Sequence, residues 1–321
     1  KGFGKLQDAE LSYLKAIDIK PDLAEAHLNL GNVLKEFGKS QDAFDSYLKA
    51  IDINPKLSNI YPSITRLLKD SDPSQLNKSK LKYIINILLE KNDISHNELT
   101  RVFNYLYSNE IKLNLNRTDS DYSNIEFFLN DQIILNALKR IIFKDSKLEK
   151  ILTQIRRDIC DRIANAKGEI TNWQLKLIIA LAEQCFSNEY IYSINKEENK
   201  YLEKIITICK KRKLNEINLS ILACYLPLYK LIDQIPSIKN FKSINNDFKE
   251  LLKLQVFEPL EEIKISKKIK TLGSITDRTS RKVRSQYEEN PYPRWKSQSL
   301  FKESRSSAIG IINNDIKPNS I

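Results

Sequence analysis

The sequence has few of the residues on which most catalytic and metal sites depend. Two histidines, His27 and His96, occur among 321 residues, so histidine-dependent triads and histidine-rich metal sites have almost no candidates. The cysteines lack any Cys-x-x-Cys spacing, which favours buried reduced thiols over a disulfide framework or a zinc site; they are Cys160, Cys185, Cys209 and Cys224. We therefore assign no catalytic residue, cofactor-binding residue or metal ligand within this chain.

Glycine, strand patterns and long apolar runs are scarce as well. Seven glycines, many lysines, leucines, isoleucines and glutamates, and no sustained alternation of apolar and polar residues predict an all-α fold. No segment reaches the roughly 20 apolar residues that a membrane span needs, and we expect the protein in the cytoplasm. Methionine is absent even at position 1. We expect the chain to be part of a longer product.

The sequence does contain an internal repeat. Residues 5–21, KLQDAELSYLKAIDIKP, return 34 positions later as KSQDAFDSYLKAIDINP at 39–55, with thirteen of seventeen positions identical. A period of this length is typical of a helix-turn-helix unit that buries its apolar face only against its neighbours. The repeat thus predicts stacked helical hairpins and a binding surface.

In the complete copy, each special residue has a mechanical reason. Gly31 permits close approach of two helices, Gly38 supplies the turn, Tyr47 fills the space between helices, and Pro55 ends the unit. Helices are predicted over about 24–37 and 40–53. The preceding copy lacks its first helix, and a third copy decays from Leu57. This pattern resembles the tetratricopeptide repeat, and we assign residues 1–70 to such repeats, the first truncated and the third degenerate.

Between residues 74 and 260 the repeat signal disappears while helical periodicity continues. Apolar stripes such as Leu81, Ile84, Ile85, Leu88 and Leu89 mark core faces. We predict a helical domain, a bundle or irregular solenoid of roughly eight helices, large enough to bury its own core. Basic residues on these helices, Arg156 and Arg157 among them, are predicted to lie on solvated faces.

Residues 261–321 read as a basic linker. Lys264–Arg284 carries eight basic residues against one acid, Asp277, within a formal net charge of +11. Aromatic residues do not alternate with these basic residues and no nucleic-acid module is recognisable, so nucleic-acid binding is not favoured. The segment Gln286–Trp295, QYEENPYPRW, follows. Its Pro-x-Pro pair predicts an extended, non-helical strip whose aromatic side chains suit docking into a groove.

Three motifs carry a family resemblance. YEENPYPRW at 287–295, AEQCFSNEY at 182–190 and FEPLEE at 257–262 resemble segments of bacterial proteins with N-terminal tetratricopeptide repeats and a C-terminal S-adenosylmethionine-dependent methyltransferase domain. No glycine-rich cofactor turn occurs in this chain. The resemblance implies a catalytic domain beyond Ile321, with S-adenosylmethionine bound there. The docking strip toward that domain would be Tyr287, Glu288, Glu289, Asn290, Pro291, Tyr292, Pro293, Arg294 and Trp295.

A peptide groove is expected along the first helix of the complete repeat. Spacing places five residues on one face of this helix: Glu25, Leu28, Asn29, Asn32 and Lys35. Asparagine amides offer donors and an acceptor, so Asn29 and Asn32 are suited to hold an extended peptide backbone whatever its sequence. The repeats are also similar to those of O-linked N-acetylglucosamine transferases, where groove asparagines act in this way. A solvated helix face explains the same residues equally well.

Two classes of function follow. The chain is either the substrate-recruiting and linker region of a methyltransferase, with a protein or peptide as partner, or a free-standing tetratricopeptide scaffold without chemistry. A recruiting arm of a glycosyltransferase is a third reading, which leaves Tyr287–Trp295 unexplained.

Overall fold

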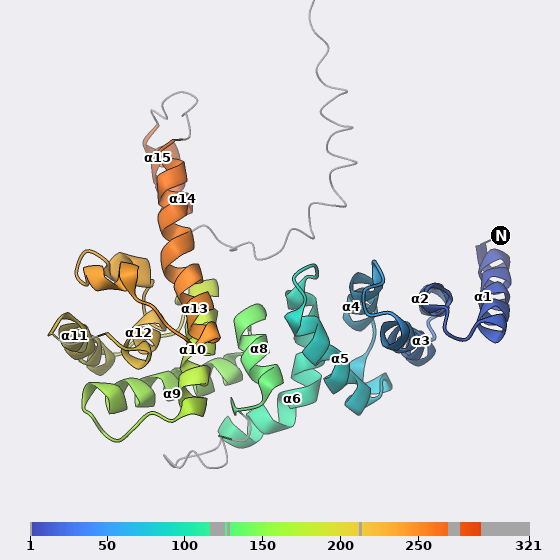
Figure 1. The fold of residues 1–321 in the computed structure, drawn as a ribbon, viewed down its shortest axis with the longest axis horizontal. Coiled ribbons are helices and arrows are strands. Elements are labelled where there is room, and N and C mark those ends of the chain that lie inside the picture. The colour runs from blue at the N-terminus through green and yellow to red at the C-terminus, as the bar shows by residue number, and fades with distance from the viewer. Residues whose placement is uncertain (1, 116–125, 127–128, 212–213, 269–276, 290–321) are drawn as a thin grey trace, which may run out of the picture. The chain divides into compact units, whose positions relative to one another are not determined.

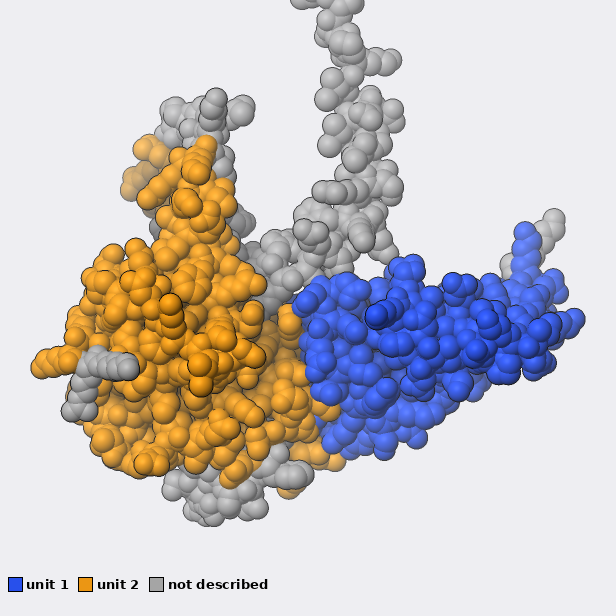
Figure 2. Space-filling model, viewed as in Figure 1, with its two compact units in different colours: residues 1–108, 295–321 blue, residues 109–294 orange. Residues whose placement is uncertain are grey.

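The chain forms helices joined by short turns and loops. A computed structural model describes residues 2–115, 126, 129–211, 214–268 and 277–289, and no strand occurs in these ranges (Figure 1). The all-α prediction is therefore confirmed. The chain divides into two compact units, coloured separately in Figure 2. Unit 1 comprises residues 1–108 together with 295–321, of which 295–321 are not described, and unit 2 comprises residues 109–294.

The described part of unit 1 is a succession of helices. α2 packs on α1 and on α3, and α3 packs on α4. Two 3-10 turns, Pro73–Gln75 and His96–Leu99, interrupt the succession. The helices are α1 (Gly2–Ile19), α2 (Ala24–Glu36), α3 (Ser40–Ile53), α4 (Ile60–Asp70), α5 (Lys78–Glu90) and the first part of α6 (Thr100–Leu115).

The hairpin α2–α3 has the bounds that the repeat predicted. Gly38, between the two helices, has a φ of 73°, a left-handed conformation that glycine adopts without strain. A Cβ at Gly31 would lie 2.6 Å from Cε1 of Tyr47, so only glycine allows this approach of α2 to α3. Tyr47 is fully buried. The predicted roles of all three residues in the hairpin are confirmed.

Helices α4 and α5 continue unit 1 where the sequence signature has faded, and α4 packs against α2 and α3. The predicted stripe of α5, from Leu81 to Leu89, is buried. The start of α5 bonds to α3. The backbone N–H of Asn77 donates to Gln41 Oε1 at 3.0 Å, and Lys80 Nζ lies 2.6 Å from Asp45 Oδ1. Residues 74–108 thus belong to the same unit as the repeats, whereas the sequence placed a domain boundary near residue 74.

Unit 2 is a second helical core. α10 packs against α8, α12 and α13, and α11 packs against α9. Side-chain caps explain where several of these helices begin: Asp131, Asp145, Thr171, Asn215 and Asn245 each accept a backbone N–H of the first turn. The helices are α8 (Gln132–Arg140), α9 (Ser146–Ala164), α10 (Asn172–Ser187), α11 (Lys196–Lys211), α12 (Glu216–Ala223), α13 (Asn246–Leu252), α14 (Glu258–Ser266) and α15 (Arg278–Glu289).

A π-helical turn, Lys253–Phe257, joins α13 to α14. Pro259 lies one turn later, where its ring would clash with the Gln255 carbonyl of a regular helix, and the wider turn relieves this clash. The same turn positions the fully buried Gln255 side chain. Its Nε2 donates to the carbonyls of Ala182 at 3.0 Å and Ala223 at 3.1 Å. Gln255 therefore joins α10 and α12 to the α13–α14 segment.

Helix α15 extends further than the sequence predicted. It ends at Glu289, so the backbone of Gln286–Glu289 is helical, and the prediction of an extended strip was wrong for these four residues, Tyr287, Glu288 and Glu289 of the docking strip among them. The physical reason is that Pro291 restricts the residue before it, Asn290, and not those further upstream. The rest of the docking strip, Asn290–Trp295, lies outside the described residues.

Candidate peptide-binding site

A hollow of about 370 Å³ lies on the surface of unit 1, among helices α1 to α4. Helices α2 and α4 supply most of its polar groups. The two helices occupy equivalent positions in successive repeats, since Arg66 follows Asn32 by 34 positions. One residue each comes from α1 and α3. The lining residues are Leu6, Asn32, Val33, Lys35, Glu36, Tyr47, Ser63 and Arg66.

Two of the five groove residues expected from the sequence, Asn32 and Lys35, line this hollow. Glu25 is exposed and Asn29 is half-buried, and neither is among the lining residues. Leu28 is 8% exposed, because it falls between the buried Ala24 and Gly31 on the packed face of α2. Helical spacing alone therefore selected three residues of α2 that do not line the hollow.

The polar groups of the hollow are held in place by neighbours. The Tyr47 hydroxyl, from α3, donates to Asn32 Oδ1 at 2.8 Å. Lys35 Nζ lies 3.3 Å from Asp70 Oδ2 at the end of α4. Burial raises the pKa of Tyr47 to about 12, with Arg66 opposing and Glu36 adding to this effect. Tyr47 is thus a neutral phenol with a proton to donate throughout the physiological pH range.

Sequence reasoning missed six side chains of the hollow, among them Val33 and Glu36 on α2. Leu6, Ser63 and Arg66 come from neighbouring repeats, and Tyr47 was assigned only a packing role. The period offered a signal for one of them, since the 34-residue offset from Asn32 leads to Arg66. The arrangement presents amide, hydroxyl, ammonium and guanidinium groups and the Glu36 carboxylate beside apolar Val33 and Leu6. Such a surface suits hydrogen bonding to a chain in extended form.

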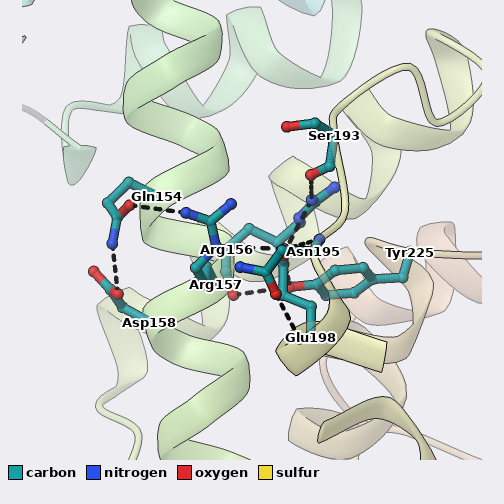
Figure 3. A network of polar contacts seen from close by, with 8 residues as sticks. All are labelled: Gln154, Arg156, Arg157, Asp158, Ser193, Asn195, Glu198 and Tyr225. Atoms are coloured by element: carbon teal, nitrogen blue, oxygen red, sulfur yellow. Dashed lines mark hydrogen bonds and ion pairs between the residues drawn. The ribbon is translucent and has the colours of Figure 1, made fainter. Parts of the chain in front are cut away.

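A second polar cluster lies in unit 2 (Figure 3). Glu198 has no exposed surface and Arg156 is 1% exposed. The Glu198 carboxylate accepts from Arg156 Nη2 at 3.2 Å, Arg157 Nε at 3.3 Å and the Tyr225 hydroxyl at 2.8 Å. Arg156 Nη2 also donates to the Ser193 carbonyl at 2.6 Å. The cluster joins α9, α11 and the segment after α12.

Electrostatics within this cluster favour the ionised carboxylate. Burial by itself would raise the pKa of Glu198. The Asn195 amide, the Tyr225 hydroxyl and the guanidinium groups of Arg156 and Arg157 outweigh it, so the pKa lies below its usual value. The prediction of a solvated face was wrong for Arg156, because a partner 42 positions away makes its burial possible. Figure 3 shows Arg156 and Glu198 turned toward one another, and both side chains are buried, as in a structural ion pair.

The motif at 182–190 belongs to the same core. Gln184 is fully buried. In the orientation that satisfies its side-chain amide, the nitrogen donates to the carbonyls of Leu138 and Ile141, and the oxygen accepts from the backbone N–H of Phe143. Glu189 and Tyr190 both have a φ of 57°, a left-handed conformation in which the chain leaves α10. These contacts place the motif in the packing of unit 2.

The cysteines are free and buried, as predicted. Burial raises the pKa of Cys160 and of Cys185 to about 12. Within the described ranges, no group of three or more histidine, cysteine or acidic side chains is placed to hold a metal ion. In the same ranges, no helix combines the length and apolar character needed to cross a bilayer.

Comparison with known proteins identifies the repeats. A TPR repeat model matches residues 4–38, and a tetratricopeptide repeat model matches residues 24–57. No curated protein and no solved structure matches the chain. The N-terminal region therefore contains tetratricopeptide repeats, whose stacked helices form surfaces that bind proteins.

Proposed function

We propose that unit 1 binds an extended peptide in the hollow between α1 and α4. The observation that carries this proposal is the hollow itself, which lies on matched tetratricopeptide repeats and is lined by the first helices of two successive units, α2 and α4. Asn32 and Lys35 are the predicted groove residues that contribute to it. The partner is a protein or peptide that presents a stretch of main chain.

The test is a selection followed by a blocking substitution. Dodecapeptides selected from a random library on the chain are titrated against the wild type and against Ser63→Trp, which fills the hollow from α4. The matched control is Lys49→Trp, which adds the same side chain at an exposed position of α3 outside the lining. We expect Ser63→Trp to weaken binding at least tenfold and Lys49→Trp to leave it unchanged. Equal effects of the two would contradict a site in the hollow.

We further propose that this recruitment serves methyl transfer by a domain attached beyond the basic linker. The support is the likeness of Tyr287–Trp295, Ala182–Tyr190 and Phe257–Glu262 to methyltransferases that carry such repeats. In this proposal S-adenosylmethionine binds only to that further domain, and the docking strip seats it.

Two measurements test this proposal, and the first of them separates it from a scaffold without chemistry. The coding sequence beyond Ile321 should encode a strand that ends in a Gly-x-Gly-x-Gly turn, and an immediate stop would favour the scaffold. Isothermal titration of the present chain with S-adenosylmethionine should give no heat of binding. Micromolar binding to this chain would place the cofactor site within it and contradict the proposal.

A further inference from the structure

Asn32 is hydrogen-bonded at only one end of its amide. Its Oδ1 accepts the Tyr47 hydroxyl at 2.8 Å, and its Nδ2 has no hydrogen-bond partner among the described residues. Asn32 is exposed and lines the hollow, whereas Tyr47 is fully buried. Both N–H groups of this amide are therefore available to a ligand, whereas one of the two lone pairs of its oxygen is already used by Tyr47.

The supply of protons fixes this orientation. The Tyr47 hydroxyl has one proton to donate, and the acceptor within reach is Asn32 Oδ1. If the amide turned by 180°, the hydroxyl would accept from Nδ2 and its own proton would lose its acceptor inside the protein. An unsatisfied buried donor is strongly unfavourable. Burial also raises the pKa of this phenol to about 12, so the proton is present at any physiological pH.

We propose that Tyr47 is a specificity-determining positioning residue that orients the Asn32 amide so that its N–H groups are presented to a ligand in the hollow. This inference depends on the proposed peptide binding. A bound chain must then place an acceptor oxygen, from a main-chain carbonyl or a carboxylate, at Asn32. The neighbouring Lys35 and Arg66 favour the same kind of group. Asn32 lies 34 positions before Arg66, so two successive repeats present donors to the ligand.

Asn32→Asp tests the donor role with the shape of the side chain retained. The carboxylate still accepts the Tyr47 proton, but it offers no donor and repels an acceptor oxygen. The matched control is Asn29→Asp, which adds the same charge one turn earlier on α2, outside the lining. For dodecapeptides whose binding Ser63→Trp abolishes, we expect Asn32→Asp to raise the Kd about tenfold or more. Asn29→Asp should change it by less than about twofold.

Tyr47→Phe tests the positioning role, because it keeps the ring against Gly31 and removes only the hydroxyl. Affinity should fall, and the effect of Asn32→Asp should be smaller in the Tyr47→Phe background, since the amide is no longer oriented there. A purely structural role of Tyr47 would leave these two effects independent. Thermal unfolding followed by circular dichroism confirms that both variants are folded.

The outcomes separate this inference from the proposed function. If peptides bind in a manner sensitive to Ser63→Trp but Asn32→Asp and Asn29→Asp behave alike, peptide binding stands and the donor role is overturned. If the two effects in the Tyr47 cycle are additive, the positioning role is overturned. A selection that gives no peptide sensitive to Ser63→Trp overturns both proposals.

The source of the acceptor oxygen is read from the ligand. Each selected peptide is compared as a C-terminal acid and as a C-terminal amide, with its acidic side chains also changed to amides. Loss of binding on amidation assigns the contact to a carboxylate. Binding that persists in the neutral peptide and still depends on Asn32 assigns it to a main-chain carbonyl.

Discussion

The helices within unit 1 and the helices within unit 2 are held together by different kinds of contact. In unit 1, α2 and α3 meet through shape, with Gly31 facing the ring of Tyr47 at a distance that excludes any Cβ. In unit 2, buried polar side chains join the helices, with Glu198 and Gln255 each bonded to groups from several segments. The packing of the repeat thus depends on the sizes of side chains close together in the sequence, and the packing of unit 2 depends on hydrogen bonds between residues far apart in the sequence.

The largest expected effect is on the ion pair of unit 2. Glu198→Ala removes the carboxylate that Arg156 faces and leaves a buried guanidinium unpaired, which should lower the free energy of unfolding by about 4 kcal/mol. Glu203→Ala, at an exposed position of the same helix, should have little effect. Urea denaturation followed by circular dichroism measures both. Similar midpoints for the two variants would show that the buried pair does not stabilise unit 2.

The Gln255 side chain should have the next largest effect. Gln255→Leu keeps the volume but removes the bonds to the Ala182 and Ala223 carbonyls and from the Leu228 amide. Because these buried groups lose a partner, we expect a loss of about 3 kcal/mol in urea denaturation. Gln132→Leu, on the exposed side of α8, is the control. If Gln255→Leu loses no more stability than Gln132→Leu, Gln255 does not join these helices.

The steric contact of unit 1 predicts a smaller effect. Gly31→Ala introduces a Cβ 2.6 Å from the Tyr47 ring and should destabilise by about 2 kcal/mol, since overpacking outweighs the gain in helix propensity. Gly4→Ala adds the same group in α1, where nothing lies within 4 Å, and should be neutral or stabilising. Thermal unfolding of the two variants measures the contrast. A stabilised Gly31→Ala would show that α2 and α3 have room between them.

The smallest effect concerns pH. The pKa of Glu198 is lowered in the folded protein, so its contribution to stability is present above the unfolded value of 4.5 and disappears as the pH falls through the lower folded value. Below pH 4.5, the free energy of unfolding of the wild type, measured by urea denaturation, should therefore fall more steeply than that of Glu198→Gln. Parallel curves for the two proteins would mean that the folded carboxylate titrates normally.

The contrast between the units also explains what the sequence could predict. Gly31, Gly38 and Tyr47 act on neighbours within one repeat, and their spacing recurs, so the hairpin and its bounds were predictable. One local signal was not used: in the motif Asn195-x-x-Glu198, each side chain bonds the backbone of the other residue, and the motif marks the start of α11.

The remaining features depend on residues far apart in the chain. Arg156 meets Glu198 across 42 positions and Gln255 meets Ala182 across 73, and neither pairing leaves a periodic trace. The candidate site shows the same limit. Helical spacing found Asn32 and Lys35 on α2, whereas Ser63 from α4 joined the hollow only when the helices were packed.

The central claim is that the stacked repeats of unit 1 bind an extended peptide in the hollow between α1 and α4. The most direct measurement is the affinity of a selected dodecapeptide, by fluorescence anisotropy, for the wild type, Ser63→Trp and Lys49→Trp. The account predicts that only Ser63→Trp loses binding. Full binding by Ser63→Trp would contradict it.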